Sequence, residues 1–114
     1  MYQMHKFRNS DKEVPARRHS NPSGTVGGWV ADSAHVDSGA YVDWDAEVSG
    51  HAHVFDGAQV YGDVGGDVII PVRVTVPQNE VLQNQKDVRL DLCRNGTIVA
   101  VSRSRADHNM EVKA

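Results

Sequence analysis

Residues 30–65 read VADSAH VDSGAY VDWDAE VSGHAH VFDGAQ VYGDVG when they are written in groups of six. Val holds the first position of all six groups, and Ala holds the fifth position of the first five. Positions one, three and five of a flat strand would share one side, yet position three is Asp, Ser, Gly or Trp. Because Gly, Asp and Ser favour turns, the chain is expected to turn a corner once per repeat, with one large and one small side chain facing inward.

This pattern resembles the hexapeptide-repeat proteins of the left-handed parallel β-helix type, in which three six-residue segments form one triangular coil. The resemblance covers residues 26–66 and is specific for the fold, not for the function. It implies an all-β chain with a short, two-coil β-helix, residues 30–47 forming the first coil and residues 48–65 the second. Stacked repeats leave apolar edges at both ends, so two coils need caps or a partner chain.

Three segments are predicted: an N-terminal strand cap (residues 1–28), the hexapeptide-repeat β-helix (29–66), and a C-terminal strand and β-hairpin with a polar tail (67–114). The composition agrees with an all-β chain, because 18 Val stand against 3 Leu and 3 Ile, and β-branched residues favour strands. In the cap, residues 2–8 and 14–19 are expected to be short strands. Trp29 is expected to plug the first coil.

The C-terminal segment is expected to contain a strand over residues 68–76 and a hairpin around Asn95-Gly96, the dipeptide that most favours a two-residue type I′ turn. Leu92 would then lie opposite Val99, and apolar side chains would gather on one face. This face must be covered by the open end of the β-helix or by another subunit. The predicted capping and oligomer-contact residues are Trp29, Val88, Leu90, Leu92, Val99 and Val101. The tail from residue 104 has no core pattern and is expected to be loose.

The net charge of -3 hides an uneven distribution, because residues 21–71 carry eight acidic residues and no Lys or Arg. Such a surface would repel nucleic acid and attract a basic groove. In the 18-residue coil, Asp45 is expected to stack beneath Asp63. The alternative interpretation is that Asp occurs here only because the corners of the coil favour it, and that these carboxylates bind no partner. The cations at the chain ends, Arg17, Arg18, Arg103 and Arg105, either pair with acidic columns or simply solvate the termini.

The favoured hypothesis is a non-enzymatic protein-binding module that contacts a partner with a basic groove and forms a homo-oligomer, either a dimer or a trimer. Direct binding to nucleic acid or a membrane is not expected. The predicted binding face, in which exposed aromatic residues lie beside carboxylates as at protein interfaces, comprises Asp37, Asp43, Trp44, Asp45, Glu47, Phe55, Asp56, Tyr61 and Asp63. The start of the repeat, Gly-Gly-Trp-Val, is similar to segments of small phage and bacterial proteins. This similarity favours an origin in a mobile element and says nothing about the target. The acidic face could partly mimic a phosphate backbone, so the hypothesis takes the form of a phage-encoded inhibitor of a host defence or nucleic-acid-processing complex.

The alternative function is a small oligomeric hexapeptide-repeat enzyme, either an acyltransferase or a zinc-dependent enzyme similar to carbonic anhydrase. His35 is expected to stack on His53 with His51 two residues away, and three imidazoles at one corner suit zinc. The family's zinc enzymes use a His-x4-His pair, which this chain lacks, and no insertion provides the loop His of the acyltransferases. We therefore predict no catalytic residue, no cofactor and no metal, with His35, His51 and His53 as the weak metal candidates.

Cysteine usage and hydropathy bear on location. Cys93 is the only cysteine, so no intrachain disulfide is possible, which fits a reducing compartment. No apolar run approaches membrane-spanning length, and the first residues are too polar for a signal peptide. A cytoplasmic protein is expected, located in the host cytoplasm if it is phage-encoded.

Overall fold

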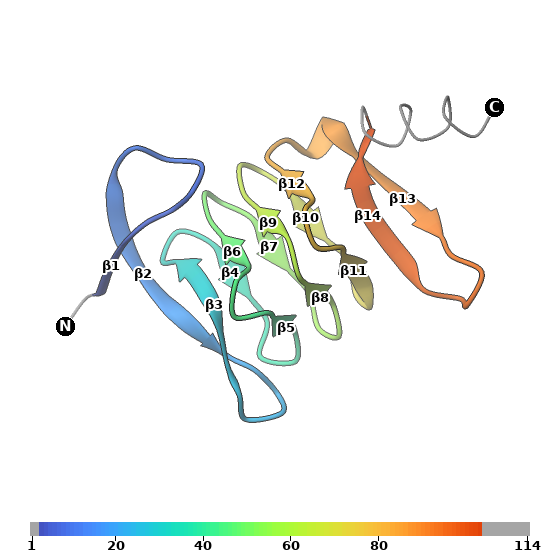
Figure 1. Ribbon diagram of the computed structural model, residues 1–114, viewed down its shortest axis with the longest axis horizontal. Helices are drawn as coiled ribbons and strands as arrows, with labels where there is room; N and C mark the ends of the chain where they lie inside the picture. Colours follow the sequence, from blue (N-terminus) through green and yellow to red (C-terminus); the bar gives the residue numbers. More distant parts are fainter. Residues whose placement is uncertain (1–2, 104–114) are drawn as a thin grey trace.

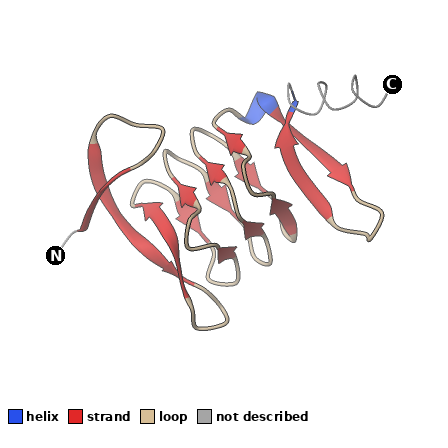
Figure 2. Cartoon of the chain, in the orientation of Figure 1, coloured by secondary structure: helices blue, strands red, loops and turns tan. Residues whose placement is uncertain are grey.

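Short strands wind around a triangular solenoid in the computed structural model, which describes residues 3–103 (Figures 1 and 2). They stack in three columns, in which successive strands pair in parallel. The first column contains β3 (Val26–Ala31), β6 (Glu47–Val48), β9 (Asp63–Val64) and β12 (Val81–Leu82). The second contains β4 (His35–Val36), β7 (His53–Val54) and β10 (Ile69–Ile70). The third contains β5 (Tyr41–Val42), β8 (Gln59–Val60) and β11 (Val74–Val76).

The repeat positions face the core as predicted. Val42, Val48, Val54 and Val60 are completely buried, as are Ala40 and Ala58 at the fifth position. Burial of each Val side chain contributes about 1.5–3 kcal/mol, so the column of inward valines is the main source of stability. The prediction of an all-β parallel β-helix is confirmed.

The β-helix has about three coils rather than two, because the six-residue period resumes after a two-residue deletion. Val30 pairs with Val48, 18 positions later, but Val48 pairs with Val64, only 16 positions later. The shorter corner lies between β8 and β9. Beyond it the period of six returns, and the buried residues are Val64, Ile70, Val76 and Leu82. The coils therefore continue to Leu82, past the boundary predicted at residue 66.

The single strand predicted over residues 68–76 is wrong. β10 and β11 are separate strands joined by a corner, at which Arg73 has a φ of 65°. Ile70 and Val74 are buried, but Val72 between them is 56% exposed because the corner turns it outward. The alternating apolar pattern therefore belongs to two sides of the triangle and not to one flat strand.

The N-terminal end is covered by two antiparallel strands, as predicted. β1 (Gln3–Lys6) pairs with β2 (Glu13–Ser20), and β2 pairs with β3. Phe7 is 1% exposed and forms a small second core with Ala16 and Ala31. Trp29 does not plug the first coil: its ring stacks on His5, with centroids 4.5 Å apart. Neighbouring side chains of a strand point to opposite sides, so Trp29 must face outward where Val30 faces inward.

A side-chain amide completes the edge of the third column at the N-terminal end. Asn21 is 4% exposed, its Oδ1 accepts a hydrogen bond from Val42 N at 2.9 Å, and its Nδ2 donates to Val42 O at 3.1 Å. These are the two bonds that a further strand would have made to β5. Since an unpaired buried polar group costs about 1–3 kcal/mol, Asn21 protects an edge that the repeat alone would leave open.

The C-terminal end is closed by a hairpin with a different register from the predicted one. β13 (Val88–Leu92) follows the 3-10 turn η1 (Gln85–Asp87) and pairs with β14 (Ile98–Ser102), which joins the third column beside β11. Leu92 lies opposite Ile98, not Val99, because the loop has three residues. Gly96 has a φ of 88° and donates to Cys93 O at 3.0 Å, as in a turn followed by a glycine bulge.

The one-residue shift divides the predicted apolar face. Val88, Leu90 and Leu92 lie opposite Ser102, Ala100 and Ile98, whereas Val99 and Val101 lie opposite Asp91 and Arg89. Val88 and Ala100 are buried in the main core, so the hairpin covers its own coil. Among residues 3–103 no helix is long and apolar enough to cross a membrane. The predicted loose tail from residue 104 lies outside the described residues.

Candidate functional site

The nine residues of the predicted binding face lie in two separate places. Asp37, Phe55 and Asp56 follow strands of the second column, whereas the other six lie at the corner that joins the third column to the first, or on the first column itself. These six are Asp43, Trp44, Asp45, Glu47, Tyr61 and Asp63. The structure therefore contains two smaller candidate sites in place of one acidic wall.

Two of the carboxylates are covered by Arg8, a residue that the sequence did not point to. Arg8 donates to Asp63 through Nε at 3.1 Å and Nη2 at 2.8 Å, and its backbone N donates to Glu47 at 2.8 Å. The Glu47 carboxylate also contacts His5 Nε2 at 2.8 Å. Glu47 and Asp63 are only 6% and 8% exposed, so both belong to the packing of the cap.

The charges around Arg8 act on its protonation. The hydrogen bond to Asp63, with the charges of Asp63, Glu47 and Asp45, raises the pKa of the Arg8 guanidinium, although partial burial works against this. Asp63 stacks on Glu47 and not on Asp45, because the two-residue deletion shifts the register. The predicted column of Asp45 and Asp63 is therefore wrong.

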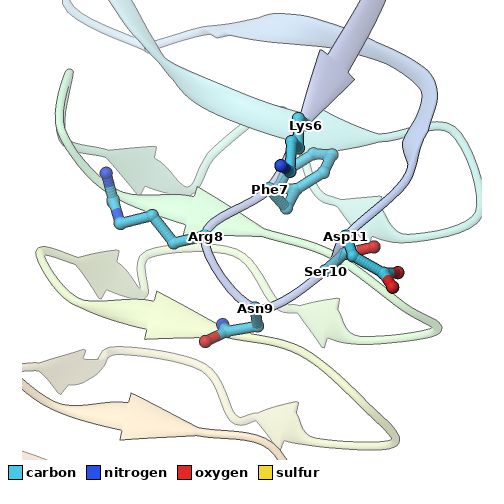
Figure 3. A pocket seen from close by; sticks show the side chains of 6 residues that line it. All are labelled: Lys6, Phe7, Arg8, Asn9, Ser10 and Asp11. Carbon is cyan, nitrogen blue, oxygen red and sulfur yellow. The ribbon is translucent and has the colours of Figure 1, made fainter.

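Arg8 projects from the loop between β1 and β2 (Figure 3). Residues 6–11 border an open hollow of about 790 Å³. In Figure 3 the side chains of Arg8 and Asp11 point away from each other across this loop. Since its side chains spread instead of converging, we place no site in this hollow.

The corner of residues 43–45, called the Trp44 ridge below, presents an exposed aromatic ring. Trp44 is 55% exposed, and the Arg18 guanidinium lies 3.5 Å from the centroid of its ring and 4.9 Å from that of Trp29. Arg18 also donates to the backbone oxygens of Gly27 and Trp44, at 3.2 and 3.3 Å. Arg18 thus holds the ring of Trp44 in place. The sequence had instead suggested Arg18 as a candidate partner for the acidic columns.

The carboxylates of the Trp44 ridge differ in exposure. Asp45 is exposed, whereas Asp43 is half-buried and accepts a hydrogen bond from Tyr41 Oη at 3.2 Å. Burial of the Tyr41 phenol and its hydrogen bond to Asp43 raise the pKa of Tyr41. Arg103, at the other end of the chain, donates to Lys86 O at 2.9 Å, and Arg105 lies outside the described residues.

Two surface pockets flank Asp45. One has a volume of about 330 Å³ and is lined by Arg8, Asp45, Tyr61, Gly62, Asp63, Gln78, Asn79, Glu80 and Val81. The other has a volume of about 150 Å³ and is lined by His5, Arg8, Arg18, Trp29, Trp44, Asp45, Ala46 and Glu47. The ridge therefore stands between two hollows that could receive side chains of a partner.

The second candidate site is a pair of imidazoles with a carboxylate on the outer side of the second column. His35 pairs with His53 in the next coil, as predicted, and their ring centroids are 4.5 Å apart. Asp37 Oδ1 lies 2.8 Å from His35 Nε2 and 3.5 Å from His53 Nε2. Among residues 3–103 these three are the one group of side chains whose ligand atoms could hold a metal ion, and His51 is not in it.

Sequence reasoning passed over Asp37 as a companion of the histidines, although the signal was present. Asp37 follows His35 by two positions, so both side chains leave the strand on the same side. Burial raises the pKa of Asp37, but the hydrogen bond from His35 and the charges of His35 and His53 lower this pKa by a larger amount. The pKa of Asp37 is therefore below its ordinary value. Asp37 Oδ2 accepts from Asp56 N at 3.1 Å, which links this carboxylate to the next coil.

No protein-family model, no curated protein and no solved structure matches this chain.

Proposed function

We propose that this protein is a non-enzymatic binding module that recognises a basic segment of a protein partner through the Trp44 ridge. One observation carries the proposal: Arg18 holds the ring of Trp44 at the surface, on the same corner as the exposed Asp45 and the half-buried Asp43. An apolar side chain of the partner would contact the indole. Lys or Arg side chains next to it in the partner would pair with the Asp45 and Asp43 carboxylates.

The energetics favour this ridge over the rest of the surface. Trp is enriched among the few residues that carry most of the binding energy at interfaces. Ordering a side chain on binding costs about 0.5–1.5 kcal/mol, and a ring already stacked against Arg18 avoids part of this cost. Arg8 forms its ion pairs with Glu47 and Asp63 and donates to the backbone oxygen of Asp45, so the exposed Asp45 carboxylate stays accessible to a partner.

The specific form of the proposal is a phage-encoded inhibitor that occupies a basic groove of a host defence or nucleic-acid-processing complex. The burial of Glu47 and Asp63 supports a narrow contact at the ridge and speaks against a broad imitation of a phosphate backbone. A narrow contact made of one aromatic ring and two carboxylates fits a peptide-like segment with alternating cationic and apolar side chains.

A random peptide library selected on the full chain tests this proposal. We expect the enriched peptides to combine Arg or Lys with an apolar residue, and their binding to weaken when the salt concentration rises, because exposed charges are screened. Trp44→Ala should weaken binding about tenfold or more. The double substitution Asp43→Asn with Asp45→Asn should weaken binding mainly at low salt.

Matched variants separate the ridge from the general surface. Phe55→Ala removes a half-buried aromatic ring elsewhere on the solenoid, and Asp32→Asn removes an exposed corner carboxylate; both should bind as the wild type does. Enriched peptides without basic residues would contradict the proposal. So would equal losses of binding for Phe55→Ala and Trp44→Ala.

Self-association is the second part of the proposal, and the C-terminal hairpin supports it. Leu90, Leu92 and Ile98 are 48%, 75% and 41% exposed on one face, and within residues 3–103 β13 is the edge strand of its sheet. Exposed apolar side chains beside a free strand edge favour pairing with a second copy.

We expect the wild type to be a dimer in sedimentation experiments and Leu92→Lys to be a monomer. The control is Met4→Lys, which changes a 50% exposed residue at the opposite cap and should stay dimeric. A wild type that is monomeric at every concentration would refute this part.

A further inference from the structure

The group His35, Asp37 and His53 contains a nitrogen atom that lacks a hydrogen bond. Nε2 of His53 is shielded from solvent and makes no hydrogen bond with any residue of the described chain. Asp37 Oδ1 lies 3.5 Å from it, within reach of an ion pair but beyond the usual range for a hydrogen bond from N–H. Unpaired buried polar atoms are rare in folded proteins and ask for an explanation such as a bound ion.

The His53 ring is held so that this nitrogen stays directed at the group. Its ring stacks on Phe55, with centroids 4.1 Å apart and an interplanar angle of 11°. Pairing of β4 with β7 places His35 directly beside it. The backbone of two coils, and not a flexible loop, therefore brings the imidazoles together.

We propose that His35, Asp37 and His53 bind a zinc ion on the outer side of the second column. Nε2 of each His and Oδ1 of Asp37 would be the ligand atoms. Imidazole ligands favour transition metals over magnesium and calcium, which prefer oxygen. Three protein ligands at a surface leave a coordination position open to solvent or to a further ligand.

The distances suit tetrahedral zinc after a small adjustment. Zn–N and Zn–O bonds of about 2.0–2.2 Å place neighbouring ligand atoms roughly 3.3–3.5 Å apart. Asp37 Oδ1 is 3.5 Å from His53 Nε2 and 2.8 Å from His35 Nε2, and one ring nitrogen of each His and one carboxylate oxygen of Asp37 lie within 4.8 Å of one another. The His35 side chain is 64% exposed, so it can rotate to open the shorter distance. Asp37 Oδ1 and His53 Nε2 already have the required separation.

The proposed zinc would connect the first coil to the second. His35 and Asp37 belong to the first coil, and His53 belongs to the second. An ion that binds only the stacked coils stabilises the folded chain by mass action. This site lies on a different column from the Trp44 ridge, so it is independent of the proposed binding function.

Zinc titration of the full chain, freed of metal with a chelator, tests the proposal. We expect one zinc ion per chain by calorimetry, a rise of the melting temperature with zinc concentration, and no comparable effect of magnesium. Cobalt in place of zinc should give the visible absorption of a tetrahedral ion. His35→Ala should lower zinc affinity by more than the 10–100-fold that loss of an outer partner costs, and Asp37→Asn should do likewise.

Control variants distinguish a ligand from a structural residue. His51→Ala changes an exposed imidazole outside the group and should bind zinc as the wild type does. His35 is itself exposed, so His35→Ala is expected to stay folded without zinc, and the effect of zinc on each variant is measured against the melting temperature of that variant without metal. Zinc affinity that is equal in the wild type and His35→Ala would overturn the proposal, as would no binding of zinc by the wild type.

Discussion

Arg8→Met is expected to lower the free energy of unfolding by about 2–3 kcal/mol. The substitution leaves the carboxylate of Asp63, which is 8% exposed, without its cation, whereas Glu47 keeps its contacts with His5 and with the backbone N of residue 8. Removing one partner of a buried ion pair costs about 3–5 kcal/mol. We expect a smaller loss here because the Arg8 side chain is 53% exposed and solvent screens it. Urea unfolding followed by Trp fluorescence measures the change.

The control for this prediction is Arg17→Met, which alters an exposed cation of β2 and should change stability by less than about 0.5 kcal/mol. Adding Asp63→Asn to Arg8→Met should recover part of the loss, since the buried charge without a partner is then removed. If Arg8→Met unfolds at the same urea concentration as Arg17→Met, then Arg8 does not fasten the N-terminal cap to the coils.

Gly66→Ala is expected to lower the free energy of unfolding by about 2–5 kcal/mol. Gly66 has a φ of 58°, and an added Cβ would overlap the backbone oxygen of Gln83 in the next coil. The added Cβ is attached directly to the backbone of residue 66, and the oxygen it overlaps belongs to the backbone of Gln83. No side-chain rotation can therefore relieve the overlap, and the two coils would have to move apart. Thermal or urea unfolding of the purified variant measures the loss.

Gly96→Ala is the matched control, because it also has a positive φ, of 88°, but no atom within 4 Å of an added Cβ. Gly96→Ala should lower the free energy of unfolding only by the cost of the left-handed backbone conformation for a residue with a Cβ, about 1–2 kcal/mol. The difference between the two variants then measures how closely the coils stack at this corner. Equal losses would mean that the contact between Gly66 and Gln83 is looser than the structure shows.

Much of the fold and two of the three residues of the proposed zinc site could be predicted from the sequence. A period of six with Val at the first position implies a corner in every repeat, and the inward valines follow from it. The neighbours His35 and His53 could be predicted because no deletion interrupts the 18 positions between them. The hairpin was expected at Asn95-Gly96, but its register depended on a three-residue loop, which the dipeptide alone does not distinguish from a two-residue loop.

The surface was harder to predict, for a physical reason. Removing two residues between Val60 and Val64 leaves the core intact, since both valines still face inward, but it changes which polar residues become neighbours in the next coil. Asp63 therefore stacks on Glu47. Arg8 reaches these carboxylates from 39 and 55 positions away, and no local periodicity reports a contact of that kind.

The sequence by itself determined the corner in every repeat and the inward valines, because the apolar position returns every six residues. Its resemblance to the hexapeptide-repeat proteins implied three sides to each coil and parallel stacking of the strands. The tertiary structure alone decided how the ends are closed and which charges remain accessible. Asn21 completes the edge of β5, Arg8 covers Glu47 and Asp63, and Arg18 supports Trp44. These contacts join residues distant in the chain, and only the folded backbone brings their side chains within reach.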